Sequence, residues 1–309
     1  MQTITAKVAQ DNDLHHHWEE HEDDTVTRLE RHVYTLAGEI GERNIDRPDG
    51  LRQAVDYISH ASHAMDYITS PQFFYTRGVL CNNLELTIEG CQRPDEIILI
   101  GAHYDSLKGC PGANDNASGV AAMLEIARNL RHRTLKRSVR FVAFTNEEPP
   151  FRGTEKMGSW VYAYRANLCD ENIKLAVMLE SLGYFSDQRN SQIAPPPLNL
   201  AIPNRGNFLA FVSNLRSAAA ARRLARQVGK HCALPHRTLF APQFTPALSW
   251  GDQSPFWLHG YRAVTVSDTA AFRYPFHHSA KDTPQHIDYT QLAEVSRGLS
   301  GAIADLAND

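Results

Sequence analysis

The chain has 309 residues, of which 42% are hydrophobic and 21% are charged, and its formal net charge is −4. This is the composition of an ordinary globular protein, and it offers no excess of positive charge with which to bind a phosphate backbone, so we exclude nucleic acid as a partner. No stretch is long and apolar enough to span a bilayer, and residues 1–24 lack the apolar segment of a secretory signal, so we expect no membrane association and a cytoplasmic location.

The first 24 residues are mostly polar and charged and contain a run of histidines. We expect them to form a mobile arm in solvent, ahead of a single domain that covers residues 25–309. Apolar residues recur at helical spacing in residues 25–41 and again in residues 51–65. This spacing predicts two amphipathic helices at the start of the domain.

The middle of the chain predicts the sheet. Residues 83–88 alternate between polar and apolar side chains, as in a half-exposed strand, whereas residues 97–100 are continuously apolar, as in a strand covered on both faces. Beyond them strand and helix patterns alternate, so we predict an α/β fold, a three-layer α/β/α sandwich around a mixed, centrally parallel sheet. The predicted strands lie at 139–144, 175–179, 208–212 and 263–266, and the predicted helices at 117–130, 158–166, 217–229 and 290–306.

A long segment at residues 183–204 interrupts this alternation and contains Pro195, Pro196 and Pro197. Loops of more than about 12 to 15 residues inside a compact domain are usually functional or disordered. The segment is therefore either a wall or lid of a ligand pocket or a disordered spacer.

The buried strand at residues 97–100 leads directly into His103 and Asp105. Ligands of parallel α/β sheets gather at the carboxyl ends of the strands, where a carboxylate can also orient a neighbouring imidazole. A hydrogen-bonded turn with no ligand is the simpler interpretation of this pair considered alone.

Asp115 comes just before the predicted helix at 117–130, a position in which an acidic residue commonly caps the free amides of the first turn. Gly112, Asn114 and Asn116 surround it and indicate unusual backbone angles, of the kind that aim one side chain at a site. The pattern is consistent with both a helix cap and a ligand.

The apolar strand at residues 139–144 is followed by two adjacent carboxylates, Glu147 and Glu148. At the end of a buried strand they would repel each other and lose hydration, so they need a compensating cation unless the loop leaves them in solvent. A metal ion would supply that charge, with one carboxylate as its ligand and the other handling the proton of a bound water.

Two further candidates complete the series. Glu180 follows the strand at 175–179, and His278 lies in a polar loop ahead of the last helix. Considered alone, neither position indicates a functional residue. Strand ends and adjoining loops that repeatedly present His, Asp or Glu, in the order in which the sheet is built, indicate one shared site.

Together these residues resemble the co-catalytic zinc exopeptidases, a family that includes bacterial leucyl aminopeptidases, glutamate carboxypeptidase and glutaminyl cyclases. The resemblance implies metal-dependent hydrolysis of a peptide or small amide substrate at a chain end. It extends from about residue 51 to residue 306 and rests on His103-Tyr104-Asp105-Ser106, Asp115-Asn116-Ala117-Ser118-Gly119, Asn146-Glu147-Glu148, Glu180, and His278-Ser279 with Asp282-Thr283.

The resemblance also implies a set of metal ligands. Asp115 would bridge two divalent ions, with zinc as the expected metal. His103 and Glu180 would complete one site, and Glu148 and His278 would complete the other.

Two further roles follow from the resemblance. Glu147 would be the general base, and Asp105 would assist catalysis by orienting the metal-bound imidazole. The family also suggests a cis peptide bond after Asp115. This chain departs from many relatives in carrying His277, where they have an aromatic residue, directly before the ligand histidine.

Two alternatives stay open. A glutaminyl cyclase-like acyl transferase would hold a single zinc ion without His103 and Glu180, but such cyclases carry Trp at the position of His277. The other is a non-catalytic metal-binding protein, although every ligand and the base implied by the resemblance are present.

The charges near the site bear on which end of the substrate is recognised. Acidic side chains favour a substrate ammonium, and basic ones favour a carboxylate. Because the chain is short and lacks the extra domains of the carboxypeptidase relatives, we expect an aminopeptidase. The candidates are equally numerous: Glu155, Asp187, Asp252 and Asp268 against Arg152, Arg189, Arg205 and Arg273.

Overall fold

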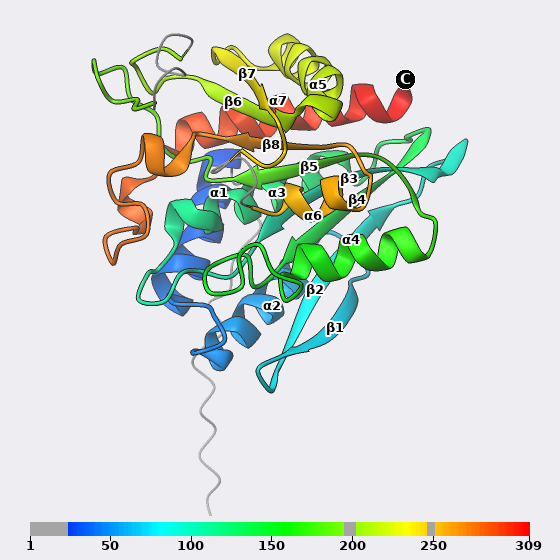
Figure 1. Cartoon of the computed structure of the whole chain (residues 1–309), viewed down its shortest axis with the longest axis horizontal. Helices are drawn as coiled ribbons and strands as arrows, with labels where there is room; N and C mark the ends of the chain where they lie inside the picture. Colours follow the sequence, from blue (N-terminus) through cyan, green and yellow to red (C-terminus); the bar gives the residue numbers. More distant parts are fainter. Residues whose placement is uncertain (1–23, 195–201, 246–250) are drawn as a thin grey trace, which may run out of the picture.

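The computed structural model of the chain describes residues 24–194, 202–245 and 251–309. Of the arm predicted for residues 1–24, only Asp24 is among them. Its carboxylate accepts a hydrogen bond from the Thr27 amide (2.8 Å) and so caps the first helix. Figure 1 shows the helices packed around one twisted sheet.

Eight strands form a single mixed sheet in the order β1-β2-β4-β3-β5-β8-β6-β7. The central strands β4, β3, β5 and β8 run parallel to one another, whereas β2 is antiparallel to β4 and β6 is antiparallel to β8. The predicted mixed sheet with a parallel centre is confirmed. The strands are β1 (Ser70–Thr76), β2 (Val79–Ile88), β3 (Arg93–His103), β4 (Arg137–Phe144), β5 (Asn172–Glu180), β6 (Leu209–Asn214), β7 (His236–Ala241) and β8 (Ala263–Ser267).

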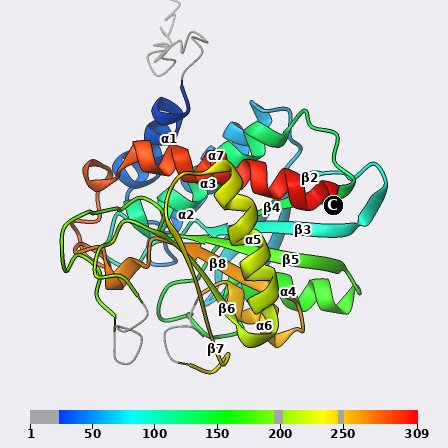
Figure 2. The ribbon, with the colours of Figure 1, turned by 90° about the horizontal axis from the view of Figure 1, so that it is seen from above.

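Helices cover both faces of the sheet. Figure 2 shows α3 and α7 on one side and α4 and α6 on the other, which is the predicted three-layer arrangement. The helices are α1 (Thr25–Val33), α2 (Pro48–His63), α3 (Ser118–Leu130), α4 (Gly158–Leu168), α5 (Ala218–His231), α6 (Gln253–Leu258) and α7 (Tyr289–Asn308). Among the described residues, none of these helices has the length and apolarity needed to cross a membrane.

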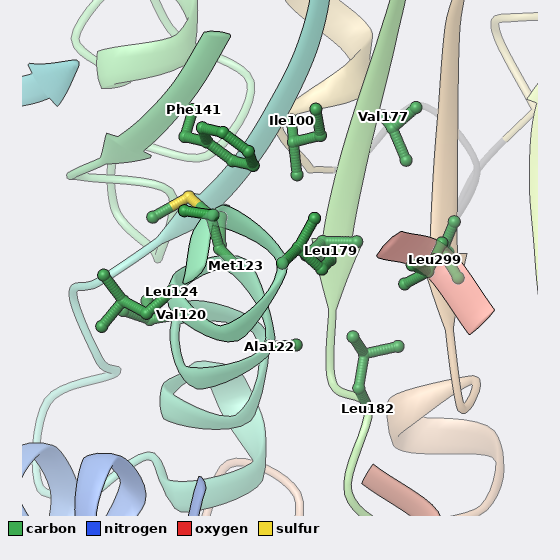
Figure 3. Packing of buried hydrophobic residues seen from close by; sticks show 14 of the residues in the cluster. Ile100, Val120, Ala122, Met123, Leu124, Phe141, Val177, Leu179, Leu182 and Leu299 are labelled. Carbon is green, nitrogen blue, oxygen red and sulfur yellow. The ribbon is translucent and has the colours of Figure 1, made fainter. Parts of the chain in front are cut away.

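The larger core lies between the sheet and the layer that contains α3 and α7. Phe141, Ile100 and Val177 project from the central strands toward Met123 of α3 and Leu299 of α7, and all five are at most 1% exposed (Figure 3). Burial of an apolar side chain of this size stabilises the fold by roughly 1.5 to 3 kcal/mol.

The opposite face of the sheet carries a smaller core. Phe144 of β4 contacts Tyr162 of α4 and Phe256 of α6, with ring centroids 5.7 and 6.2 Å apart. The central strands are therefore covered on both faces, which explains their continuous apolar sequence.

Among the described strands and α-helices, β1, β7 and α6 were not predicted. The helix predicted for residues 25–41 is divided, because a π-helical segment, Tyr34–Ile40, follows α1.

The described part of the 183–204 segment contains no helix or strand, and residues 195–201 lie outside the described part. Its buried Gln192 accepts a hydrogen bond from Arg273 Nε (2.9 Å), which ties the segment to the loop after β8. A role as a lid stays a prediction.

Candidate metal centre

The parallel strands carry three candidate residues to the same end of the sheet, where the strands have their carboxyl ends. His103 is the last residue of β3 and pairs with Phe144, the last residue of β4, so Glu147 follows beside it. Glu180 is the last residue of β5, the neighbour of β3 on its other side.

The turn after β4 is fixed by Asp105. Asn146 has a left-handed backbone (φ 61°), a conformation that asparagine adopts more readily than most residues. The turn directs the amides of Glu147 and Glu148 toward the two carboxylate oxygens of Asp105, each at 3.2 Å. Asp105 Oδ1 also lies 3.4 Å from Nδ1 of His103, so one buried carboxylate positions both segments.

Asp115 lies between two groups of side chains. Its Oδ1 is 3.3 Å from Nε2 of His103, and its Oδ2 is 3.2 Å from Nε2 of His278. Neither oxygen forms a hydrogen bond to a described residue, and it is Asn116 whose side chain accepts from the Gly119 amide (3.1 Å). The helix-cap interpretation of Asp115 is therefore wrong. The peptide bond between Asp115 and Asn116 is cis, as the family resemblance implied.

The backbone around Asp115 is held by a carboxylate from the far end of the chain. Asp282 Oδ1 accepts from the Asn114 amide (2.7 Å) and Oδ2 from the Asp115 amide (3.1 Å). The Tyr274 hydroxyl donates to the same carboxylate at 3.0 Å. Asp282 follows His278 by four residues, so it positions the last candidate ligand together with Asp115.

The potential ligand atoms form two groups that share Asp115. In the first group Nε2 of His103 lies 3.3 Å from Glu180 Oε2. The second group consists of Asp115, His277 and His278, and Nε2 of His278 also lies 3.3 Å from Oε2 of Glu148. His278 has a left-handed backbone (φ 55°), a conformation that histidine adopts more often than most residues.

Burial and mutual charge perturb the titration of the site. Burial alone would lower the pKa of His103, but the carboxylates of Glu180, Asp105 and Asp115 raise it well above its usual value. Burial and the negative charge of Asp115 raise the pKa of Glu148 to about 7, and the pKa of Glu180 is raised by the same two effects. The protein alone therefore stabilises these carboxylate charges poorly.

The side chains offer unpaired atoms that could hold divalent metal. Both oxygens of Asp115, Oε1 of Glu148 and Nε2 of His278 are buried without a hydrogen-bond partner among the described residues. Imidazoles and carboxylates in this proportion, with partial exposure on one side, are typical of a catalytic zinc site rather than of a closed structural one.

His277 is a neighbour of the site that the sequence did not single out as a ligand. Its Nδ1 lies 3.2 Å from Oδ2 of Asp115 and has no hydrogen-bond partner among the described residues, and its ring stacks on His278 with centroids 3.8 Å apart. The tandem histidines were the available signal, because adjacent residues in a tight turn can direct both rings to one side.

Arg43 is a second residue that the sequence did not indicate. It is fully buried beneath the segment that joins His103 to Asp115 and donates to five backbone carbonyls. Burial lowers its pKa to about 10, so the guanidinium stays charged at neutral pH. The acceptors are Tyr104 (2.8 Å), Leu36 (2.7 Å), Gly41 (2.6 Å), Pro111 (2.6 Å) and Gly112 (3.1 Å).

The charged candidates for substrate recognition separate into three sets. Arg152 contacts Glu147 directly, with Nη2 2.7 Å from Oε2. Asp252, Asp268 and Arg273 are buried, and Asp268 accepts hydrogen bonds from the Asn114 side chain and the Tyr184 amide. The other candidates are exposed: Glu155, Asp187, Arg189 and Arg205.

Comparison with known proteins places the chain in a family. The family model described as Peptidase family M28 matches residues 83–303. The chain belongs to peptidase family M28. The suspected relationship to the zinc exopeptidases is thereby confirmed.

The proteins of similar sequence include an uncharacterized protein and two aminopeptidases. The uncharacterized protein YfbL of Escherichia coli (strain K12) is 32% identical over 281 residues, which covers 88% of this chain and 85% of that protein. Aminopeptidase Y of Saccharomyces cerevisiae is 37% identical over 87 residues, but the match covers only 28% of this chain and 15% of that protein.

Solved structures share the fold of the chain. The zinc aminopeptidase BSAP of Bacillus subtilis superposes with a TM-score of 0.72 at 14% identity, covering 92% of this chain and 95% of that one. The glutaminyl cyclase of Fimbriiglobus ruber gives a TM-score of 0.66 at 20% identity, covering 90% and 94%. Aminopeptidases and glutaminyl cyclases thus share this fold. The choice between the two activities therefore depends on the residues of the site.

Proposed function

We propose that this M28 protein is an aminopeptidase that hydrolyses the first peptide bond of its substrate with two zinc ions. The observation that carries the proposal is the position of Asp115, whose two oxygens face two separate groups of potential ligands at 3.2 to 3.3 Å. Relatives that are named as aminopeptidases support the reaction class.

Each ion would have its own protein ligands besides the shared Asp115. His103 and Glu180 would hold the first ion, and Glu148 and His278 would hold the second. When bound, the ions would polarise the scissile carbonyl and lower the pKa of a bound water.

Glu147 would move the proton. It is 1% exposed, and burial raises its pKa although Arg152 and His103 counteract that effect. Its Oε2 lies 3.9 Å from Nε2 of His103, beside the first ligand group without belonging to it. Glu147 would accept a proton from the attacking water and donate it to the leaving nitrogen, so that the C–N bond breaks and a carboxylate and a free amine form.

The single-zinc cyclase alternative has less support. It leaves His103 and Glu180 without a ligand role. Both residues lie with Asp115 at the carboxyl ends of the strands, and His103 Nε2 is 3.3 Å from Glu180 Oε2. If Asp115 bridges two ions, by contrast, both His103 and Glu180 have a role as ligands.

The proposal is tested by comparing two variants. Glu147→Gln should keep two ions per chain but lose turnover of amino-acid amides by about 100-fold or more, because it removes the proton acceptor. His278→Ala should lose one ion. Metal content is measured by elemental analysis after dialysis against zinc, and hydrolysis by amine release.

Glu155→Gln is the control, because Glu155 is exposed and lies in the same loop as Glu147. It should behave like the parent protein in both measurements. Equal loss of metal in Glu147→Gln and His278→Ala would show that the base is misassigned, and one ion in fully supplemented protein would favour the cyclase alternative.

A further inference from the structure

Arg152 is placed unusually close to the proposed base. Its Nη2 lies 2.7 Å from Oε2 of Glu147 and 2.9 Å from Oε2 of Glu148, and the arginine side chain is 21% exposed. It belongs to the loop that follows β4. Its Nε forms no hydrogen bond to a described residue.

Both contacts of Arg152 with these carboxylates are made by Nη2. Its other guanidinium nitrogens are therefore left for a further partner. An arginine with donors to spare is suited to binding a carboxylate.

The reaction itself places a substrate group near Arg152. If Glu147 returns a proton to the leaving nitrogen, that nitrogen has to lie within hydrogen-bond reach of the Glu147 carboxylate. The next carbonyl carbon of the substrate is two bonds away, through bonds of about 1.46 and 1.52 Å. The oxygens on that carbon would therefore lie near Arg152, which contacts Oε2 of the same carboxylate.

The chemistry of that group depends on substrate length. In a dipeptide the carbon belongs to the terminal carboxylate, whereas in a longer peptide it belongs to a neutral amide. A hydrogen bond between ionised partners is roughly twice as strong as a neutral one. Arg152 therefore favours a substrate that ends one residue after the scissile bond.

A cavity beside Arg152 gives that last residue a place. Its volume is about 450 Å³, and its walls are mainly apolar, with Pro149, Phe244, Trp257 and Leu258 among them. Arg152 is the one charged side chain in the lining formed by described residues. The lining therefore combines an apolar surface for a side chain with one cation for a carboxylate.

We propose that Arg152 binds the terminal carboxylate of the leaving residue, which makes free dipeptides the preferred substrate class. This inference rests on the proposed peptidase function, since it assigns a substrate to that reaction. It concerns specificity and gives Arg152 no role in proton transfer.

The test compares three substrates of the zinc-loaded protein. Leu-Gly places a carboxylate next to the leaving nitrogen, Leu-Gly amide replaces it by a neutral group, and Leu-Gly-Gly moves it one residue away. We expect kcat/KM for Leu-Gly to exceed the other two values by at least tenfold. Equal values would overturn the inference while leaving the peptidase proposal intact, whereas no hydrolysis of any of the three would count against the peptidase proposal itself.

Variants then assign the preference to Arg152. Arg152→Met should reduce the ratio of Leu-Gly to Leu-Gly amide to about one, mainly through a higher KM for Leu-Gly, with two ions still bound. Arg152→Gln, which is polar but uncharged, gives the same comparison if the methionine variant does not fold. A ratio that persists in the folded variant would overturn the assignment.

Arg77→Met is the matched control. Arg77 is exposed, and its guanidinium lies 5.1 Å from the ring of Phe151. The substitution therefore removes the same charge near the same loop without changing a contact of Glu147. This variant should keep the parent protein's ratio of kcat/KM for Leu-Gly to kcat/KM for Leu-Gly amide. A reduced ratio in this variant would show that net charge near the loop, and not a contact with Arg152, sets the preference.

Discussion

Replacement of Arg43 by methionine should destabilise the protein and weaken its metal centre. Methionine fills much of the buried volume but donates no hydrogen bond, so five carbonyls lose the Arg43 donor. Two of them keep a backbone donor, because Leu36 also accepts from the Gly41 amide and Gly112 from the Ala117 amide. A buried acceptor left unsatisfied costs about 1 to 3 kcal/mol. Because water and small backbone shifts will satisfy some of them, we expect a total loss of about 3 to 5 kcal/mol, among the larger effects of a single substitution.

The expected loss can be measured as a change in melting temperature and in metal content. At roughly 2 °C per kcal/mol for a large domain, the melting temperature should fall by about 6 to 10 °C. The carbonyls of Tyr104, Pro111 and Gly112 lie between His103 and Asp115, so zinc binding should weaken as well.

A surface arginine provides the control for this substitution. Arg52 pairs with Asp49 at 3.0 Å, with both side chains more than two-thirds exposed, so Arg52→Met should change stability by no more than about 0.5 kcal/mol. A fall of less than 2 °C in Arg43→Met, with normal zinc content, would refute the argument that these bonds hold the segment in place.

Two further substitutions probe other buried groups. Burial alone would raise the pKa of Glu125, but the His32 side chain 3.8 Å away and hydrogen bonds from Arg28 hold that pKa at about 2. The contribution of Glu125 to stability is therefore complete above about pH 5 and is lost as the pH falls toward 2. Glu125→Gln should therefore be less stable than the parent by about 3 kcal/mol in urea unfolding at pH 7 and should approach it near pH 2, and parallel curves over that range would contradict this linkage. His277→Phe should weaken zinc binding at one of two sites by about tenfold or more in chelator competition, because the Nδ1 near Asp115 is lost, and unchanged affinity at both sites would show that His277 is a bystander.

The central part of the fold could be predicted because burial leaves a clear pattern. β3, β4 and β5 are covered on both faces and are continuously apolar in the sequence. β1 and β7 are the two edges of the sheet, and their side chains are mostly half-buried or exposed, so neither shows a strong alternation. α6 has only six residues, too few for a helical period to be recognised.

The candidate ligands could be predicted for a related reason, since most of them follow an apolar strand. The groups that position them could not. Arg43 and Asp282 act on backbone amides and carbonyls of the 104–115 segment, and a hydrogen bond to backbone places no requirement on the sequence of its partner. Arg152 was one of several charged candidates, and only the three-dimensional turn after β4 brings it to Glu147.

The double hydrogen bond from Asp282 to the Asn114 and Asp115 amides also limits how this loop can be changed. Residues 279–281 are not ligands, yet their number sets how far the imidazole of His278 can lie from the carboxylate of Asp115. An insertion or deletion there would shift the candidate ligand His278 relative to Asp115, even if both residues were retained. Loop exchange between this protein and its relatives should therefore preserve the length from His278 to Asp282 and can vary the side chains between them.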